Sequence, residues 1–147
     1  VMKHLPGHGL STVDSHNTTP VVHENRKILN NIDFTAFKKK NIFLAITAHI
    51  IFKSFDPINT ATHSKNIIKK LIRNKINYKN IIISDDISMK ALQFSFKDNV
   101  LKAFQAGCNL VLHCNGKINE MNKLAEISPK IDNFTLKKTS QFYNFLR

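Results

Sequence analysis

Ile81-Ile82-Ile83-Ser84-Asp85-Asp86 is the stretch of this chain that decides its fold class. Three consecutive β-branched residues without polar alternation are typical of a short parallel strand, because such a strand is covered on both faces. The run then turns polar at once, with two adjacent carboxylates. In parallel α/β folds the chemistry collects at the carboxyl ends of strands. The stretch therefore predicts a buried parallel strand with Asp85 and Asp86 at its functional end.

Apolar runs of strand length lie on both sides of this stretch, at 41–47 and at 109–114. Helical patterns separate them, at 64–75 and from Ser88 to Ala106, with Gly107 expected to close the second helix. Two more helical stretches follow residue 118. Alternating strands and helices predict an α/β fold built on a parallel sheet. Three polar residues are expected to cap helices: Asp33, Ser64 and Asp86.

A second unusual stretch stands near the start, Lys3-His4-Leu5-Pro6-Gly7-His8-Gly9, followed by Asp14-Ser15-His16. Pro6 has no N–H group, and Gly7 and Gly9 permit backbone angles that other residues avoid. We therefore expect an irregular loop. Because it concentrates titratable groups on a restrained backbone, it is the best candidate for an active-site loop in the chain.

These residues carry a resemblance to a known family. KHLPGHG and DSH resemble the KH(F/I)PGHG…DSH signature of the glycoside hydrolase family 3 β-N-acetylglucosaminidases, bacterial enzymes of cell-wall recycling. Three more motifs follow in the same order: TAHI from Thr47, ISDDISM from Ile83 and AGCNLVL.CN from Ala106. The resemblance implies the C-terminal half of a (β/α)8 TIM-type barrel. It makes residues 1–147 a partial catalytic domain that lacks the first barrel half.

The resemblance assigns the nucleophile to Asp85, the first Asp of SDD. A retaining glycosidase uses such a carboxylate to form a covalent glycosyl-enzyme intermediate that water then hydrolyses. From the residues alone, either carboxylate could instead cap the next helix, which is the role we expect for Asp86.

The family uses a histidine as general acid/base, matched here by His16. An imidazole with a reference pKa of about 6.5 can give and take a proton near neutrality. Asp14, two residues earlier, could fix the tautomer of the ring. Without the resemblance, a surface histidine and a turn residue would be the simpler interpretation of the pair.

Further sugar contacts are implied for Lys3 and His4, which match family residues that hydrogen-bond the sugar hydroxyls. His49, from TAHI, could face the sugar or could equally be a structural residue at a strand end. His8 is expected to shape the loop. The remaining histidines have no expected role: His23, His63 and His113.

The chain departs from the family pattern at Leu10, Asn109 and His113, which affects local packing more than chemistry. The absent first half matters more, because in the family it supplies further sugar-binding groups, including an arginine and an aspartate. Half a barrel has two unpaired sheet edges and an open core. We therefore expect the chain to be marginally stable or aggregation-prone alone, and inactive unless a companion chain carrying the first barrel half completes it.

The composition is strongly basic, with 22 Lys and Arg against 10 Asp and Glu, a net charge of +12 over 147 residues. Apart from Lys38-Lys39-Lys40 the lysines are scattered, and they are not interleaved with aromatic residues as in a nucleic-acid-binding surface. We expect a carbohydrate substrate containing N-acetylglucosamine, no nucleic-acid partner and no cofactor.

Cys108 and Cys114 fall on one expected strand, where six residues place them about 20 Å apart, too far for a disulfide. Two reduced core thiols indicate a cytoplasmic protein. No apolar run reaches the length of a membrane span.

Two other classes of function remain open. His4, His8, His16 and Asp14 include possible metal ligands of a metal-dependent hydrolase, although Pro6 and the glycines disrupt any regular ligand spacing. The chain could also be an inactive truncated remnant or a basic binding module.

Overall fold

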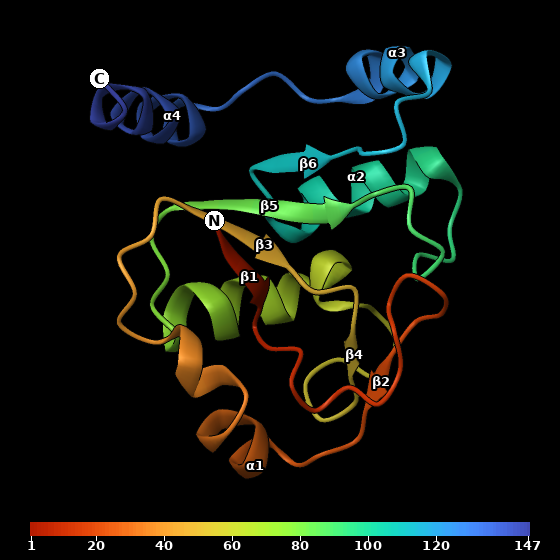
Figure 1. The fold of residues 1–147 in the computed structure, drawn as a ribbon, viewed down its shortest axis with the longest axis vertical. Helices are drawn as coiled ribbons and strands as arrows, with labels where there is room; N and C mark the ends of the chain where they lie inside the picture. The colour runs from red at the N-terminus through yellow and green to blue at the C-terminus, as the bar shows by residue number, and fades with distance from the viewer.

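The computed structural model describes all residues from 1 to 147 (Figure 1). Four parallel strands form the main sheet in the order β1-β3-β5-β6: β1 (Met2–Leu5), β3 (Leu44–Thr47), β5 (Ile81–Asp86) and β6 (Leu110–Leu112). A second parallel sheet consists of β2 (Val21–Val22) and β4 (Ile51–Phe52). The α-helices are α1 (Arg26–Asn31), α2 (Phe96–Ala106), α3 (Ile118–Ile127) and α4 (Asn133–Phe145). Two 3₁₀ segments, η1 (Phe34–Phe37) and η2 (Ala61–His63), and a π-type helix, η3 (Ile67–Lys75), complete the chain. The predicted parallel α/β fold is confirmed.

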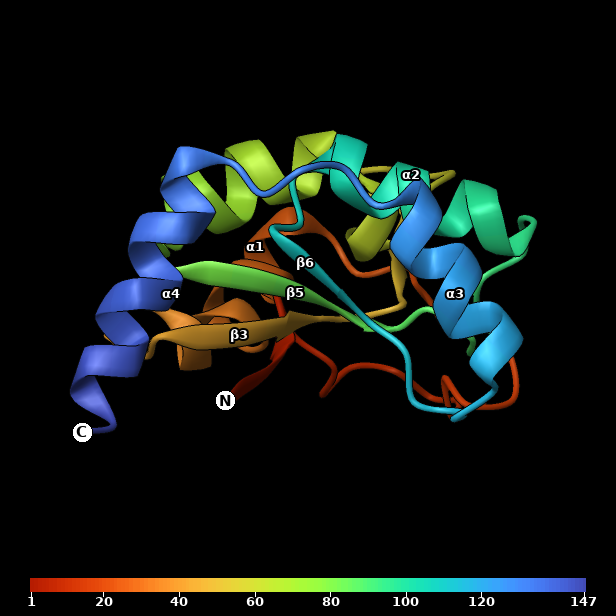
Figure 2. The same ribbon diagram turned by 90° about the horizontal axis from the view of Figure 1, so that it is seen from above.

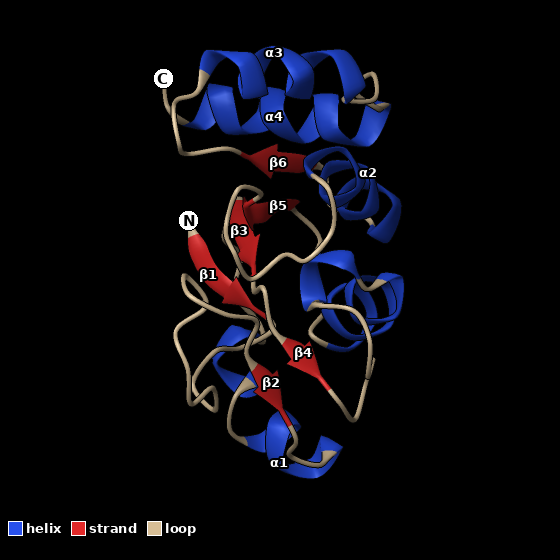
Figure 3. Ribbon diagram, turned by 90° about the vertical axis from the view of Figure 1, so that its right-hand side faces the viewer, coloured by secondary structure: helices blue, strands red, loops and turns tan.

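The two faces of the main sheet differ. Helices η3 and α2 pack along one face, and the core lies between them and the strands (Figures 2 and 3). On the other face the register places Ile46 beside Ile83, and Ile83 beside Leu110. These three side chains are half-buried and lie outside the core cluster. Helix α4 lies near the starts of the strands, where its Phe142 ring packs 5.5 Å from that of Phe43.

Strand β1 was not expected. The prediction of an irregular loop from Lys3 to Gly9 is wrong for its first residues, because Met2 and Leu5 pair with Ala45 and Thr47 of β3. Leu5 is fully buried. This strand forms through a partner about forty residues away, which local composition does not reveal; the loop itself begins only at Pro6.

The second long helix is shorter than predicted. It begins at Phe96 and not near Ser88, with Ser95 as its N-cap, whose side chain accepts the N–H of Asp98. Residues 88–95 form turns, so Asp86 caps no helix. At the other end Gly107 closes the helix as predicted, with a φ of 116° that favours glycine. Ser64 also serves a helix start as predicted, because its Oγ accepts the N–H of Ile67 at 3.1 Å.

The two cysteines are free, but only Cys108 is buried; Cys114 is exposed, so the prediction of two core thiols is wrong for the second. The strand ends at Leu112, which leaves Cys114 in the loop that follows. Burial raises the pKa of the Cys108 thiol to about 12, which makes it an unreactive packing residue. None of the helices has both the length and the apolar character that crossing a bilayer requires.

His63 predicts a loss of stability in mild acid. Its ring is buried between η2 and α2, with Nε2 3.1 Å from the carbonyl oxygen of Asn99. Burial, with a smaller contribution from His49, lowers the pKa of His63 from 6.5 to about 4. Because the unfolded chain binds this proton more readily, stability is lost as the pH falls from 6.5 toward 4, by roughly 3 kcal/mol for this group. Urea unfolding across this range should show a shallower pH slope for His63→Gln than for the wild type. Equal slopes would contradict the assignment.

Candidate active site

The carboxyl ends of β1 and β5 carry the predicted chemistry, and both strands are bulged there. Between its paired residues Met2 and Leu5, β1 has one residue more than β3. Strand β5 likewise has one residue more than β6 between Ile83 and Asp86. A bulge re-aims the side chains of its strand, and bulges are common beside active sites. The two bulged segments contain His4 and Asp85.

The side chains of His4, from β1, and Asp85, from β5, face each other where the strands of the main sheet end. His4 Nε2 lies 3.5 Å from Asp85 Oδ2, and the two side chains are 29% and 17% exposed. The other carboxylate oxygen, Oδ1, accepts the backbone N–H of Asp86 at 2.9 Å. Burial lowers the pKa of His4, and the opposing effect of Asp85 is smaller. The His4 ring, which the lowered pKa favours in its neutral form, therefore lies beside the carboxylate of Asp85 without neutralising it.

Asp14 and His16 form a carboxylate–histidine pair. Asp14 Oδ1 lies 2.8 Å from His16 Nδ1 and also accepts the backbone N–H of His16 at 2.9 Å. The backbone hydrogen bond, followed by the side-chain one, lowers the pKa of Asp14. The carboxylate therefore stays ionised, and Nδ1 carries a proton while Nε2 is left for other chemistry. Both side chains are well exposed, at 78% for His16 and 61% for Asp14.

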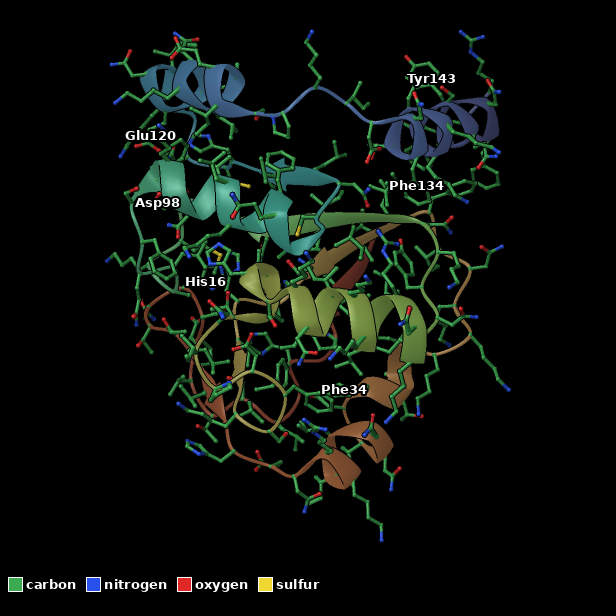
Figure 4. The ribbon with its side chains drawn as sticks, turned by 180° about the vertical axis from the view of Figure 1, so that it is seen from behind. His16, Phe34, Asp98, Glu120, Phe134 and Tyr143 are labelled. Atoms are coloured by element: carbon green, nitrogen blue, oxygen red, sulfur yellow. The ribbon has the colours of Figure 1, made fainter.

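The loop that carries His16 is linked to His4 through His8. The ring of His8 lies 5.6 Å from that of His4, and its Nε2 lies 3.5 Å from the Oγ of Ser15, the residue between Asp14 and His16. Figure 4 shows His16 on the same side of the view as Asp98, in the first turn of α2, and on the opposite side from Phe134 and Tyr143. The loop is also tied to the chain that follows β5, since Thr19 Oγ1 donates to the carbonyl oxygen of Ala91 at 2.5 Å.

The PGHG loop is held by Asp33. Asp33 stands at the N-cap position of η1 as predicted, but its side chain makes no cap hydrogen bond to that helix. Its Oδ1 accepts instead the N–H of Gly9 at 2.9 Å. A Cβ atom on Gly7 would lie 2.3 Å from Asp33 Cγ, so only glycine fits at this position while the aspartate is in place. His8, between the two glycines, reaches the next loop, with Nε2 3.5 Å from Ser15 Oγ.

His49 is sealed in the interior, 1% exposed, which favours the structural role among the two left open for it. Its Nε2 lies 3.0 Å from the carbonyl oxygen of Asp86, so Nε2 must be the donor. Nδ1 is then an acceptor for the hydroxyl of Thr62, 2.8 Å away, and burial lowers the pKa of the ring in agreement with a neutral state. This contact fixes the backbone directly after Asp85.

The other predicted residues are placed as follows. Lys3 is exposed on β1, beside His4. Asp86 organises the loops around the site, because its Oδ1 accepts N–H groups of Ser88 and Cys114. The sequence does not predict this role of Asp86 or the contact of Asp33 with the PGHG loop. Gly9 is 24 positions from Asp33, Cys114 is 28 positions from Asp86, and Ser88 lies in a turn where a helix was predicted. No three His, Cys, Asp or Glu side chains of the chain gather into a group that could hold a metal ion.

Comparisons with known proteins identify the family of the chain. Residues 1–140 match the family described as "Glycosyl hydrolase family 3 N terminal domain". A β-hexosaminidase of Photobacterium profundum is 30% identical in an alignment of length 155 that covers 99% of this chain and 46% of that protein. The chain thus spans less than half the length of this curated relative.

Solved structures show the same similarity. A glycoside hydrolase family 3 β-N-acetylglucosaminidase from Paenibacillus sp. str. FPU-7 is 26% identical with a TM-score of 0.80, covering 95% of this chain and 28% of that one. NagZ from Neisseria gonorrhoeae, in complex with N-trifluoroacetyl-D-glucosamine, is 25% identical with a TM-score of 0.80 and covers 94% and 40%. The parallel α/β fold is accordingly the TIM-barrel-like fold of this family. With nearly its whole length matched, the chain belongs to glycoside hydrolase family 3.

Proposed function

We propose that this chain supplies the nucleophile and the acid/base pair of a retaining glycosidase. Its substrates would be terminal non-reducing β-N-acetylglucosaminides, such as the muropeptide fragments of peptidoglycan recycling in the cytoplasm. The observation that carries the proposal is the arrangement at one sheet edge. There, Asp85 faces His4 at 3.5 Å, and the ring of His8, 5.6 Å from that of His4, contacts Ser15 between Asp14 and His16. The names of the β-hexosaminidase and β-N-acetylglucosaminidase relatives support the sugar specificity.

In the first step the Asp85 carboxylate attacks the anomeric carbon and forms a covalent ester with the sugar. The bond to the leaving oxygen breaks, and its electron pair stays with that oxygen. Protonated His16 donates its Nε2 proton to the oxygen as this happens. Asp14, held at Nδ1, stabilises the imidazolium before the transfer.

In the second step a water molecule attacks the same carbon. Neutral His16 accepts the proton of the water, and the bond between the sugar and Asp85 breaks. Two inversions at the anomeric carbon retain its configuration. Lys3 and His4, beside the nucleophile, are proposed to hydrogen-bond the sugar hydroxyls.

We further propose that the active form contains more βα units than this chain, supplied by a companion that completes the barrel. The outer strands β1 and β6 each have one neighbour in the sheet, and the face with Ile46, Ile83 and Leu110 is only half-buried. A closed barrel would pair both edges and cover that face.

The test is to assay residues 1–147 alone, and co-expressed with the part of the Photobacterium profundum β-hexosaminidase that precedes its match to this chain. We expect no turnover of 4-nitrophenyl N-acetyl-β-glucosaminide by the chain alone. The pair should hydrolyse it, and NMR of the first product should show the β-anomer. His16→Ala should lower the rate of the pair by about 10²–10⁴-fold, the usual contribution of general acid–base catalysis.

Other outcomes are informative. Turnover by the isolated chain would overturn the need for a companion but keep the chemistry. An inverted product would contradict the role of Asp85. A folded pair without turnover would favour the alternative of an inactive remnant.

A further inference from the structure

Asp33, which holds the PGHG loop, is a buried carboxylate outside the proposed catalytic groups. Asp33 is 7% exposed and has no basic side chain within salt-bridge distance. Its Oδ2 is buried without a hydrogen-bond partner. Burying a carboxylate costs free energy unless its neighbours compensate, so a residue in this position needs a reason beyond packing.

The compensation comes from the backbone of the PGHG loop. Gly9 donates its N–H to Oδ1 at 2.9 Å, a charge-assisted hydrogen bond between the loop and the carboxylate. Burial has the largest effect and raises the pKa of Asp33, while the hydrogen bond from Gly9 opposes it.

The held loop leads to the acid/base pair. His8 directly precedes Gly9, and its Nε2 lies 3.5 Å from the Oγ of Ser15, the residue between Asp14 and His16. Ser15 is 7% exposed, whereas its two neighbours are exposed. Ser15 is thus the buried anchor of an otherwise solvent-exposed catalytic segment, and its side-chain contact runs to the PGHG loop.

We propose that Asp33 is a positioning residue that seats the acid/base segment by holding the PGHG loop, with the contact passing through His8 and Ser15. It touches no substrate and transfers no proton. The inference rests on the proposed function for its consequence in catalysis, but its structural content can be tested separately.

The first test is hydrogen–deuterium exchange of the 147-residue chain, followed by mass spectrometry. Asp33→Ala should speed exchange in segment 5–18 by at least about tenfold, because local opening of that segment becomes easier. Asp33→Asn should restore most of the protection, since its amide oxygen can still accept the Gly9 N–H. Asp56→Ala is the matched control: Asp56 also accepts backbone N–H groups, from Ile58 and Asn59. Replacing Asp56 should leave the exchange rate of segment 5–18 unchanged. Unchanged exchange in Asp33→Ala, or equal acceleration in Asp56→Ala, would overturn the proposal.

The second test uses the form that turns over and compares kcat/KM for phenyl and 2,4-dinitrophenyl N-acetyl-β-glucosaminides. A misplaced general acid harms the poor leaving group most, because the dinitrophenolate departs without protonation. Asp33→Ala should therefore lose at least about tenfold more rate with the phenyl substrate. An equal loss with both would mean a structural role only. If no form turns over, the proposed function fails while the exchange experiment still decides whether Asp33 holds the loop.

Discussion

Asp85→Asn is expected to abolish hydrolysis, with a loss of at least about 10³-fold in kcat, because an amide oxygen is a far weaker nucleophile than a carboxylate. The substitution is nearly isosteric. Its amide oxygen can keep the hydrogen bond from the Asp86 N–H, now made by Oδ1. The free energy of unfolding should therefore change little while turnover disappears, and both should be measured on the form of the protein that hydrolyses the substrate.

The matched control is Asp86→Asn, one residue along the same strand end. Asp86 holds the N–H groups of Ser88 and Cys114 and is not proposed to react. Its substitution should reduce activity much less than that of Asp85. A slow, fluorinated N-acetylglucosaminide should label the peptide with Asp85 and leave the Asp85→Asn variant unlabelled. Equal losses in the two variants would contradict the distinction between these neighbours.

Gly7→Ala is expected to give the largest loss of stability among single-methyl changes, about 1–3 kcal/mol from overpacking. The added Cβ would meet Asp33 Cγ at 2.3 Å and both carboxylate oxygens at 2.6 Å, inside a buried loop. Gly7 does not have a positive φ, so the expected cost is steric and not conformational. Urea unfolding at pH 7 measures it.

Gly7→Ala should also be made in the Asp33→Ala variant. If the clash is with the carboxylate, Gly7→Ala should lower the free energy of unfolding much less there than in the wild type, so the effects of the two substitutions should be non-additive. Gly9→Ala serves as the milder control, because its Cβ would lie 3.2 Å from Asp33 Oδ1. Full additivity of Gly7→Ala and Asp33→Ala would show that the aspartate does not occupy the space beside Gly7.

Helix caps can be predicted from the sequence only where their hydrogen-bond partners are close along the chain. Gly107 and Ser64 act as predicted because a cap depends on residues three or four positions away. Asp33 fitted the same local pattern but is engaged by a loop 24 residues upstream. The start of α2 was also misplaced, because Asp86 is drawn into contacts with Ser88 and Cys114 that replace a helical turn.

The sequence by itself determined the parallel α/β class, the order of its apolar strands, the polar residues at their carboxyl ends and the family. These features depend on residue type and on neighbours a few positions away, so they can be predicted from the sequence alone. Only the tertiary structure decided that Met2–Leu5 is a strand, that His4 faces Asp85, that His49 is sealed, and that Asp33 holds the PGHG loop. Each of these depends on pairing or burial between segments 24 to 81 positions apart, and the free energy of such contacts is set by the folded chain as a whole.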